Sequence, residues 1–324
     1  MKAVLCKAFG PPEALVVEEI ESLTPSKYQV VVQVKAAGVN FPDTLMIQGQ
    51  YQFKPPFPFS PGAESAGVVK AVGSGVEGVK VGDRVIAFTG HGAFAEEVLA
   101  TPDQLTPIPE GVDFRVAASF IMTYATSYHA LKDRAHLQPG ETLLVLGAAG
   151  GVGLSAVELG KQMGARVIAA ASSEEKLAVC QQHGADDLIN YASEDLKQRV
   201  KDLTGSNGVD VVYDPVGGDF SEAALRGIAW NGRFLVIGFT AGQIPRIPLN
   251  LALLKGCSIV GVFWGAFTAR QPQQYQQNQR ELLGMLQAGK LKPRISHTYP
   301  LAQAADALND ILQRRVTGKA VLMV

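Results

Sequence analysis

Hydrophobic positions in the first part of the chain come in short runs that turn residues separate. Examples are "YQVVVQVKAAGV", "ESAGVVKAVG" and "DRVIAF", with Gly, Pro and Asp between them. Short alternating or apolar runs bounded in this way are typical of strands, and a series of them predicts a barrel or sandwich. The Pro-rich segment 51–62, "YQFKPPFPFSPG", suits neither a strand nor a helix and predicts a loop. Residues 1 to about 115 are therefore predicted to be β-rich.

From about Phe120 the pattern changes to strand-like runs that alternate with helical ones. The strand-like runs are "TLLVLG", "RVIAAAS", "DDLINY", "VDVVYD", "RFLVIGF" and "SIVGVFW". This βαβ alternation predicts an α/β domain with a doubly wound parallel sheet. A Gln-rich segment, 270–289, then predicts an exposed helix, and the chain closes with a helical pattern and the strand "KAVLMV". We expect this last strand to rejoin the N-terminal β-rich domain.

Composition narrows the class of protein. The net charge is −1, so no basic field is available for nucleic acid or an acidic membrane surface. No apolar run approaches the roughly 20 residues that span a bilayer. The cysteines, Cys6, Cys180 and Cys257, are three in number and far apart, which argues against a disulfide framework. With no leader-like segment at the N-terminus, we expect a cytoplasmic protein that binds neither nucleic acid nor membrane.

A glycine turn follows the first strand of the predicted parallel sheet. Aligned on the fingerprint G-x-G-x-x-G, it consists of Ala148, Ala149, Gly150, Gly151, Val152 and Gly153, so that alanine replaces the first glycine. Gly150 lets backbone N–H groups approach a pyrophosphate, and Gly153 lets the following helix pack closely on the strand. Because the turn lies between a strand and a helix of a βαβ series, it predicts a dinucleotide site.

The end of the second strand distinguishes between the two nicotinamide cofactors. NAD-dependent sites place an acid there, whereas this strand ends in Ser172. A serine hydroxyl and Lys176, one helical turn later, suit the 2′-phosphate of NADP. In the alternative, Ser172 forms a capping box with Glu175 and Lys176 is an exposed helix residue. We favour NADP.

A metal site is not predicted. The chain contains no CxxC pair, and its five histidines (His91, His129, His136, His183 and His297) form no cluster with ligand spacing. Reduction of a simple carbonyl without a Lewis acid is difficult. Quinones and activated alkenes disperse the incoming charge by conjugation, so positioning and hydrogen-bond donors suffice for them.

Several motifs in the same order resemble one family. They are "AAGVNFPDTLMIQGQY", "PFSPGAESAGVV", "VGDRVIAF", "LVLGAAGGVG", "DPVGG" and "GKAVL". Together they resemble the zinc-free quinone oxidoreductases of the medium-chain dehydrogenase/reductase superfamily. Zinc members of that superfamily carry a Gly-His-Glu signature and a cysteine in the first domain. The corresponding residues here are Gly62-Ala63-Glu64 and Asn40.

The resemblance implies a GroES-like domain beside a Rossmann domain, and reduction of a quinone by NADPH in the cleft between them, without zinc or flavin. We expect the GroES-like domain to comprise residues 1–120 and 266–324 and the Rossmann domain residues 121–265. Members of the family are commonly homodimers joined through the last Rossmann strand. The apolar segment "CSIVGVFW" is suited to such an edge.

Individual site residues follow from the resemblance. For the substrate and the reaction it implies Asn40, Asp43 and Tyr51. For the cofactor it implies Thr126 at the nicotinamide, Gly150, Gly151, Val152 and Gly153 at the pyrophosphate, and Ser172, Lys176 and Tyr191 at the 2′-phosphate, with Gly238, Phe263, Trp264 and Lys319 nearby. Simpler roles stay open for two of them: Asp43 as a residue that orients its loop, and Trp264 as a core residue.

Two other functions are considered. The segment "DTLMIQGQY" also resembles 2-enoyl thioester reductases of the same superfamily, in which Tyr51 would protonate the carbon next to the carbonyl. An NADPH-dependent enoyl thioester, alkenal or enone reductase is therefore the first alternative. The second is a protein that binds the nucleotide without turnover, as a sensor or a crystallin-like structural protein.

Overall fold

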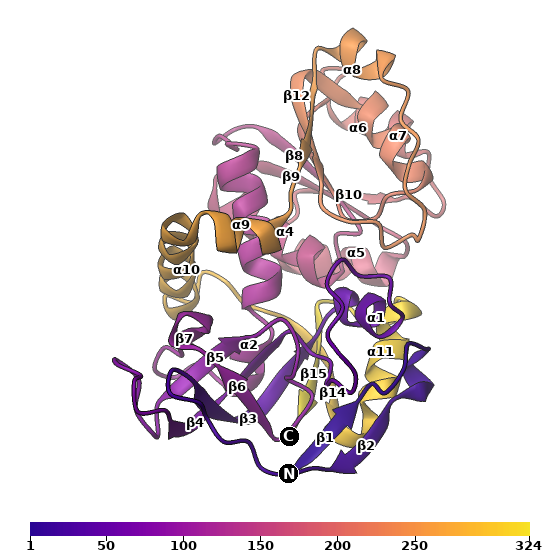
Figure 1. The fold of residues 1–324 in the computed structure, drawn as a ribbon. Coiled ribbons are helices and arrows are strands. Elements are labelled where there is room, and N and C mark those ends of the chain that lie inside the picture. The colour runs from indigo at the N-terminus through magenta and orange to yellow at the C-terminus, as the bar shows by residue number, and fades with distance from the viewer. The chain divides into compact units, whose positions relative to one another are not determined.

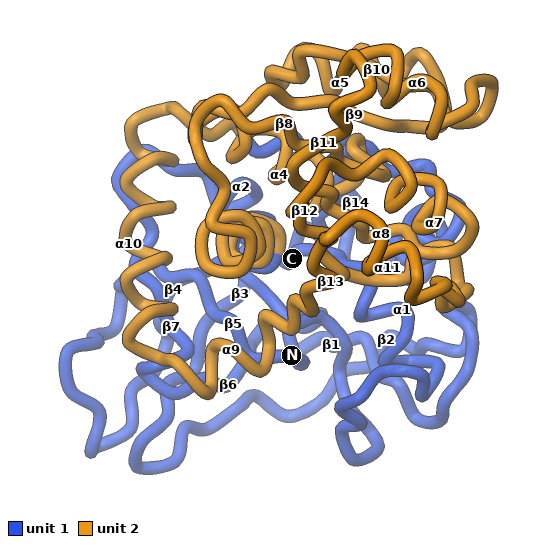
Figure 2. Tube along the Cα trace, turned by 90° about the horizontal axis from the view of Figure 1, so that it is seen from above, with its two compact units in different colours: residues 1–122, 293–324 blue, residues 123–292 orange.

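The computed structural model describes residues 1–324, which divide into two compact units (Figures 1 and 2). Unit 1 comprises residues 1–122 and 293–324, and unit 2 comprises residues 123–292. The first unit is thus built from both ends of the chain.

Strand β3 (Val30–Val39) organises unit 1. Most of its side chains are buried, and it pairs in antiparallel fashion with β4 (Glu64–Val72), β15 (Lys319–Met323) and β6 (Glu97–Ala100). The seven-stranded sheet has the order β14-β15-β3-β4-β5-β7, with β6 paired to β3. The last strand of the chain therefore lies beside β3, as its apolar sequence led us to expect.

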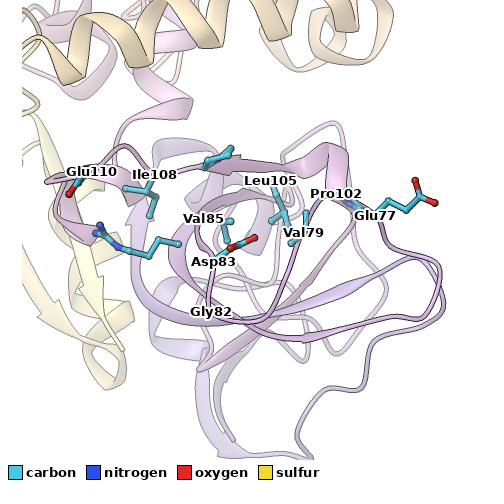
Figure 3. Close-up of a pocket in the computed structure, with 12 residues that line it drawn as sticks. Glu77, Val79, Gly82, Asp83, Val85, Pro102, Leu105, Ile108 and Glu110 are labelled. Atoms are coloured by element: carbon cyan, nitrogen blue, oxygen red, sulfur yellow. The ribbon is translucent and has the colours of Figure 1, made fainter.

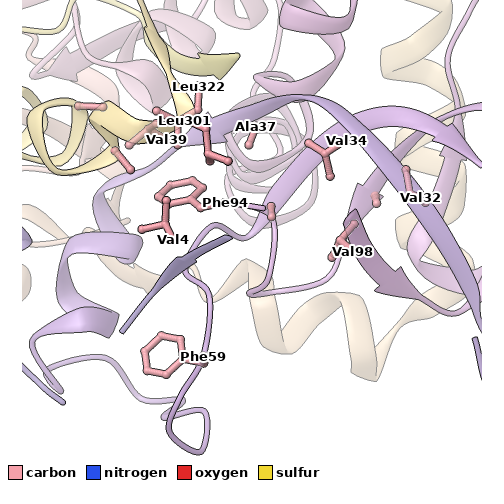
Figure 4. Close-up of a cluster of buried hydrophobic side chains, with 14 of the residues drawn as sticks. Val4, Val32, Val34, Ala37, Val39, Phe59, Phe94, Val98, Leu301 and Leu322 are labelled. Atoms are coloured by element: carbon pink, nitrogen blue, oxygen red, sulfur yellow. The ribbon is translucent and has the colours of Figure 1, made fainter. Parts of the chain in front are cut away.

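The other elements of unit 1 complete this sheet and add a second, smaller one. Strands β5 (Arg84–Phe88), β7 (Leu105–Pro107) and β14 (Ile295–Pro300) belong to the seven-stranded sheet, whereas β1 (Lys2–Leu5) and β2 (Val16–Glu19) form a two-stranded sheet. The helices of unit 1 are α1 (Phe41–Ile47), α2 (Phe114–Ala118) and α11 (Ala304–Leu312), with 3-10 turns η1 (Pro12–Ala14), η2 (Pro102–Gln104) and η5 (Leu301–Gln303). Figure 4 shows the core, in which Val4, Phe94 and Leu322 come from widely separated parts of the sequence. The prediction of a β-rich first domain is confirmed.

Unit 2 contains a six-stranded sheet in which every pair of strands is parallel. Its order is β10-β9-β8-β11-β12-β13, the strand order of a dinucleotide-binding doubly wound sheet. The strands are β8 (Thr142–Leu146), β9 (Arg166–Ala171), β10 (Asp187–Asn190), β11 (Val209–Asp214), β12 (Ile228–Val236) and β13 (Ser258–Gly261). Residues 143–146 of the central strand β8 are fully buried, because helices cover such a sheet on both faces. The predicted fold class is confirmed.

Helices connect these strands. They are α4 (Gly151–Gln162), α5 (Glu174–Gln182), α6 (Leu196–Leu203), α7 (Asp219–Arg226) and α8 (Asn250–Lys255), preceded by α3 (Thr126–Tyr128) and followed by α9 (Trp264–Arg270) and α10 (Pro272–Gln287). Two segments beside α3, η3 (Ile121–Ala125) and η4 (His129–Arg134), are π-helical. The Gln-rich segment thus forms a helix, as its sequence predicts.

The second boundary between the units differs from the expected one. The sequence placed it at 265/266, whereas unit 2 extends to Lys292. Polar contacts hold α10 to η4: Lys132 Nζ lies 2.5 Å from Glu281 Oε2, and Asn278 Nδ2 donates to Asp133 Oδ2 over 2.7 Å. These partners are about 150 positions apart in the chain, so no local pattern shows the attachment.

Candidate active site

The end of β3 lies beside the starts of its two neighbouring strands, β4 and β15. Asn40 directly follows the last residue of β3, and Glu64 and Lys319 are the first residues of β4 and β15. Both of these strands run antiparallel to β3, one on each side, with Gly38 opposite Glu64 and Val39 opposite Ala320. The register therefore places all three side chains at the same end of the sheet.

These side chains form a buried polar cluster. The Lys319 ammonium donates to Asn40 Oδ1, to Glu64 Oε1 over 3.0 Å and to the carbonyl of Val39 over 3.1 Å. Glu64 also accepts from Asn40 Nδ2 over 3.0 Å and from the backbone N–H of Met122 over 2.9 Å. Glu64 is 0 % and Lys319 4 % exposed, so removal of either one leaves a buried charge unpaired, at a cost of roughly 3–5 kcal/mol.

This arrangement bears on the role of Lys319, which the resemblance assigned to the cofactor. All three of its ammonium hydrogens already have acceptors within unit 1. Both amide hydrogens of Asn40 are also engaged, with Glu64 and, over 3.4 Å, with the carbonyl of Gly38. Lys319 and Glu64 therefore hold the Asn40 amide in one orientation, and the geometry favours a positioning role for Lys319.

Asp43 lies in the first turn of α1 and is fully buried. Its Oδ2 accepts from the backbone N–H of Asn40 over 2.8 Å, while Oδ1 forms no hydrogen bond of ordinary geometry. Burial raises the pKa of the Asp43 carboxyl to about 7, although the Asn40 N–H and the positive charge of Lys319 oppose the rise. Asp43 therefore gains or loses a proton near neutral pH.

Tyr51 follows α1 and packs, half-buried, against the core of unit 1. Burial is the main cause of a raised pKa of its phenol, and the negative charge of Asp43 adds to the rise. The Tyr51 hydroxyl consequently remains protonated at neutral pH and is available as a hydrogen-bond donor.

Most residues predicted to bind the cofactor lie at one edge of the parallel sheet of unit 2. Gly150, Ser172 and Tyr191 follow the carboxyl ends of β8, β9 and β10, and Gly238 and Phe263 come just after β12 and β13. Ligands of doubly wound sheets bind outside the carboxyl ends of the strands, where the strand order reverses. That reversal lies between β8 and β11.

The glycine turn uses a residue that our alignment missed. Gly147, directly after β8, adopts a φ of +56°, a conformation that favours glycine. The alignment had placed the first fingerprint position on Ala148, because the spacing is G-x-x-G-x-x-G here. A Cβ on Gly153 would lie only 2.3 Å from the Gly147 carbonyl oxygen, so this position requires glycine. Gly150 is the N-cap of α4, and a helix N-terminus favours negative charge.

At the end of β9 the capping-box alternative is wrong. Ser173, not Ser172, is the N-cap of α5, and its Oγ accepts from the backbone N–H of Lys176. Ser172 Oγ instead accepts from the Lys176 ammonium over 3.2 Å. The neighbouring Glu174 carboxylate accepts from the Asn190 side chain over 2.7 Å. A hydroxyl and an ammonium therefore stand at the end of β9, where NAD-dependent sites carry an acid.

The remaining predicted residues have different surroundings. The Tyr191 ring packs against Phe220 with the ring centroids 4.4 Å apart. Thr126 begins α3, and Gly238 lies in the loop after β12. Phe263 is 59 % exposed, whereas Trp264 is buried with its ring edge-on to Tyr275, which favours a packing role for Trp264.

Three further features concern surface pockets, metal binding and membrane-spanning helices. A surface pocket of about 760 Å³ in unit 1 (Figure 3) is lined by residues such as Glu77, Val79, Leu105 and Glu110, and contains none of the predicted site residues. No three His, Cys, Asp or Glu side chains are grouped so as to hold a metal ion. No helix has the length and apolar character needed to cross a membrane.

Comparisons with known proteins agree with this geometry. Residues 26–110 match the alcohol dehydrogenase GroES-like domain, and residues 151–283 match the zinc-binding dehydrogenase family. The chain is 43 % identical to the quinone oxidoreductase-like protein 2 homolog of Nematostella vectensis, over 99 % of this chain and 88 % of that protein. It is 36 % identical to the quinone oxidoreductase of Pseudomonas aeruginosa over 99 % of both. The chain belongs to the quinone oxidoreductase family of the medium-chain dehydrogenase/reductases.

A solved structure extends the likeness to three dimensions. The quinone oxidoreductase of Escherichia coli, crystallised with NADPH, superposes with a TM-score of 0.94 at 30 % identity and covers 100 % of both chains. The expected GroES-like and Rossmann domains are thus both present, and the chain is an oxidoreductase of this family.

The raised pKa of Asp43 predicts a pH-dependent stability. Protonated Asp43 stabilises the fold below its unfolded pKa near 4, and this contribution is lost as the pH rises through about 7. The free energy of unfolding of the wild type should fall between these limits by roughly 2–4 kcal/mol more than that of Asp43→Asn. Urea unfolding at a series of pH values measures the two slopes.

The exposed Asp103 of unit 1 supplies the matched control. Asp103→Asn should reproduce the wild-type slope. Equal slopes for wild type and Asp43→Asn would show that Asp43 ionises normally in the folded protein.

Proposed function

We propose that the protein is an NADPH-dependent quinone oxidoreductase that works without zinc or flavin. One observation carries the choice of cofactor: the Ser172 hydroxyl and the Lys176 ammonium lie together at the end of β9. The family and its relatives named quinone oxidoreductase support the choice of substrate.

The residues present fit NADPH. The close approach at Gly153 leaves no room for a Cβ and brings the start of α4 against the end of β8, which suits a bound pyrophosphate. Ser172 and Lys176 would hold the 2′-phosphate with a hydroxyl and a positive charge, beside Tyr191. Thr126 would contact the nicotinamide end, as the family resemblance implies.

Unit 1 supplies the groups for the substrate. When bound, NADPH supplies a hydride, and the addition of this hydride and one proton converts a quinone into a hydroquinone. Tyr51 donates a hydrogen bond to a quinone oxygen, which stabilises the negative charge that develops there. Asp43 is fully buried and accepts from the backbone N–H of Asn40, so it orients the loop that carries Asn40. Asn40, held by Glu64 and Lys319, shapes the site beside them.

An enoyl thioester, alkenal or enone reductase is the second candidate. It is favoured by the same protonated Tyr51, since these reactions require an acid that protonates carbon after hydride addition. The two functions differ in how strongly turnover depends on the Tyr51 hydroxyl.

We also propose a homodimer formed through the edge of the parallel sheet. Strand β13 is the last strand of that sheet and pairs only with β12. Large apolar side chains near it are exposed: Trp230 (71 %), Leu249 (76 %), Leu253 (79 %), Leu254 (69 %) and Ile259 (41 %). An open strand edge and an apolar surface of this kind require cover in a stable protein.

The cofactor proposal predicts the effect of Lys176→Ala. Loss of the ammonium should raise the KM for NADPH about tenfold and leave the KM for NADH within about twofold, because only NADPH carries the 2′-phosphate. Steady-state kinetics with a para-quinone measure both constants, and Lys197→Ala, at an exposed lysine of the same unit, is the control. An equal effect on both cofactors would contradict the assignment.

The substrate proposal predicts the effect of Tyr51→Phe. Loss of one neutral hydrogen bond should lower kcat for quinones by only about 3- to 10-fold, whereas loss of a general acid should lower turnover of an enone or enoyl thioester by at least about 100-fold. A panel of both substrate classes, with the exposed Tyr28→Phe as control, separates the two functions. Efficient wild-type reduction of enoyl thioesters and no reduction of quinones would favour the second candidate.

The dimer proposal predicts that Leu253→Asp, which places a charge in the exposed apolar surface, produces monomers. Sedimentation velocity measures the molar mass. Val81→Asp, at a valine of unit 1 that is 63 % exposed, should leave the dimer intact. A wild type that sediments as a monomer would refute the proposal.

A further inference from the structure

Three buried hydroxyl groups lie together beneath the glycine turn of unit 2. Ser127 Oγ is 2.8 Å from both Ser155 Oγ and the Tyr213 hydroxyl. Both serine oxygens lie 3.0 Å from the carbonyl oxygen of Val152, and Ser155 Oγ lies 3.1 Å from that of Thr123. The three side chains are at most 1 % exposed.

The protons of these hydroxyls can be arranged without leaving any of them unsatisfied. Each hydroxyl has one hydrogen to donate and two lone pairs that accept. In one such arrangement, Tyr213 donates to Ser127, Ser127 donates to Ser155, and Ser155 donates to the carbonyl of Val152 or Thr123. Because a buried hydroxyl without a partner is costly, removal of one member disturbs the others.

The network joins segments that carry predicted cofactor contacts. Val152 lies in the first turn of α4, whose N–H groups face the predicted pyrophosphate site. Ser127 is the neighbour of Thr126 in α3, the residue expected at the nicotinamide. Tyr213 lies in β11, next to the central strand β8, and gives both segments a common anchor on the sheet.

We propose that Ser127, Ser155 and Tyr213 are positioning residues for the dinucleotide: the network fixes the first turn of α4 relative to the segment that carries Thr126. This inference rests on the proposed binding of NADPH at that turn. A ligand that spans the pyrophosphate and nicotinamide positions needs both segments at a fixed separation, and supporting hydrogen bonds maintain such a geometry. A ligand that touches only the end of β9 does not depend on it.

The test compares two ligands in titration calorimetry. NADPH spans the whole site, whereas adenosine 2′-monophosphate carries only the half that Ser172 and Lys176 would bind. In Tyr213→Phe and in Ser127→Ala, the Kd for NADPH should rise about 5- to 20-fold. The Kd for adenosine 2′-monophosphate should change less than about twofold, because its contacts lie outside the network.

Two further variants sharpen the test. Thr204→Val removes a hydroxyl that donates to the Val200 carbonyl over 2.7 Å at the end of α6, and it should leave both affinities unchanged. In a double-mutant cycle, Tyr213→Phe and Ser155→Ala should not be additive in NADPH binding, because Ser127 links the two hydroxyls.

The relative affinities for the two ligands decide whether the network positions the dinucleotide. Equal weakening of both ligands, or no weakening of NADPH, overturns the positioning role. Tyr213→Phe removes a single oxygen and serves if Ser127→Ala does not fold. A wild type that binds adenosine 2′-monophosphate and not NADPH overturns the proposed function as well.

Discussion

The ion pair between Glu64 and Lys319 is the interaction on which the proposed substrate site in unit 1 depends. Both charges are buried, so each is tolerated only because the other is within hydrogen-bond distance and the remaining lone pairs and protons are satisfied. The pair brings together residues that are 255 positions apart and joins the last strand of the chain to the first half of unit 1. It also sets the orientation of Asn40 and contributes to the field around Asp43, whose pKa Lys319 lowers and Glu64 raises.

The cofactor half depends on a different constraint, the parallel sheet of unit 2. Parallel strands present all their carboxyl ends on one side of the sheet, so five separate loops, spread from Gly150 to Phe263 in the sequence, lie along that side. The close packing at Gly147 and Gly153 places the positive end of α4 on this side. The hydroxyls of Ser127 and Ser155 lie within hydrogen-bond distance of the Val152 carbonyl in the first turn of α4.

The proposed substrate site and the proposed 2′-phosphate site differ in how deeply their polar side chains are buried. Around Asp43 and Tyr51, burial disfavours ionisation: it raises the pKa of Asp43 to about 7 and keeps the Tyr51 phenol protonated at neutral pH. At the end of β9, Lys176 is only partly buried, and the carboxylate of Glu174 is bound to the side chain of Asn190. A protonated phenol suits an uncharged quinone, the substrate proposed here, and an ammonium suits a phosphate.

Much of this protein is determined by local sequence. The change from turn-separated strands to βαβ alternation predicts both domains, and the apolar "KAVLMV" predicts a strand that rejoins the first one. Gly150, Gly153 and Ser172 can be recognised because a glycine turn and a strand end depend on neighbouring residues. Other properties were decided by the tertiary structure alone. Ser173 rather than Ser172 caps α5, and α10 belongs to unit 2. Lys319 pairs with Glu64, and burial raises the pKa of Asp43 to about 7. These properties depend on contacts between distant residues and on burial, which no short segment of sequence contains.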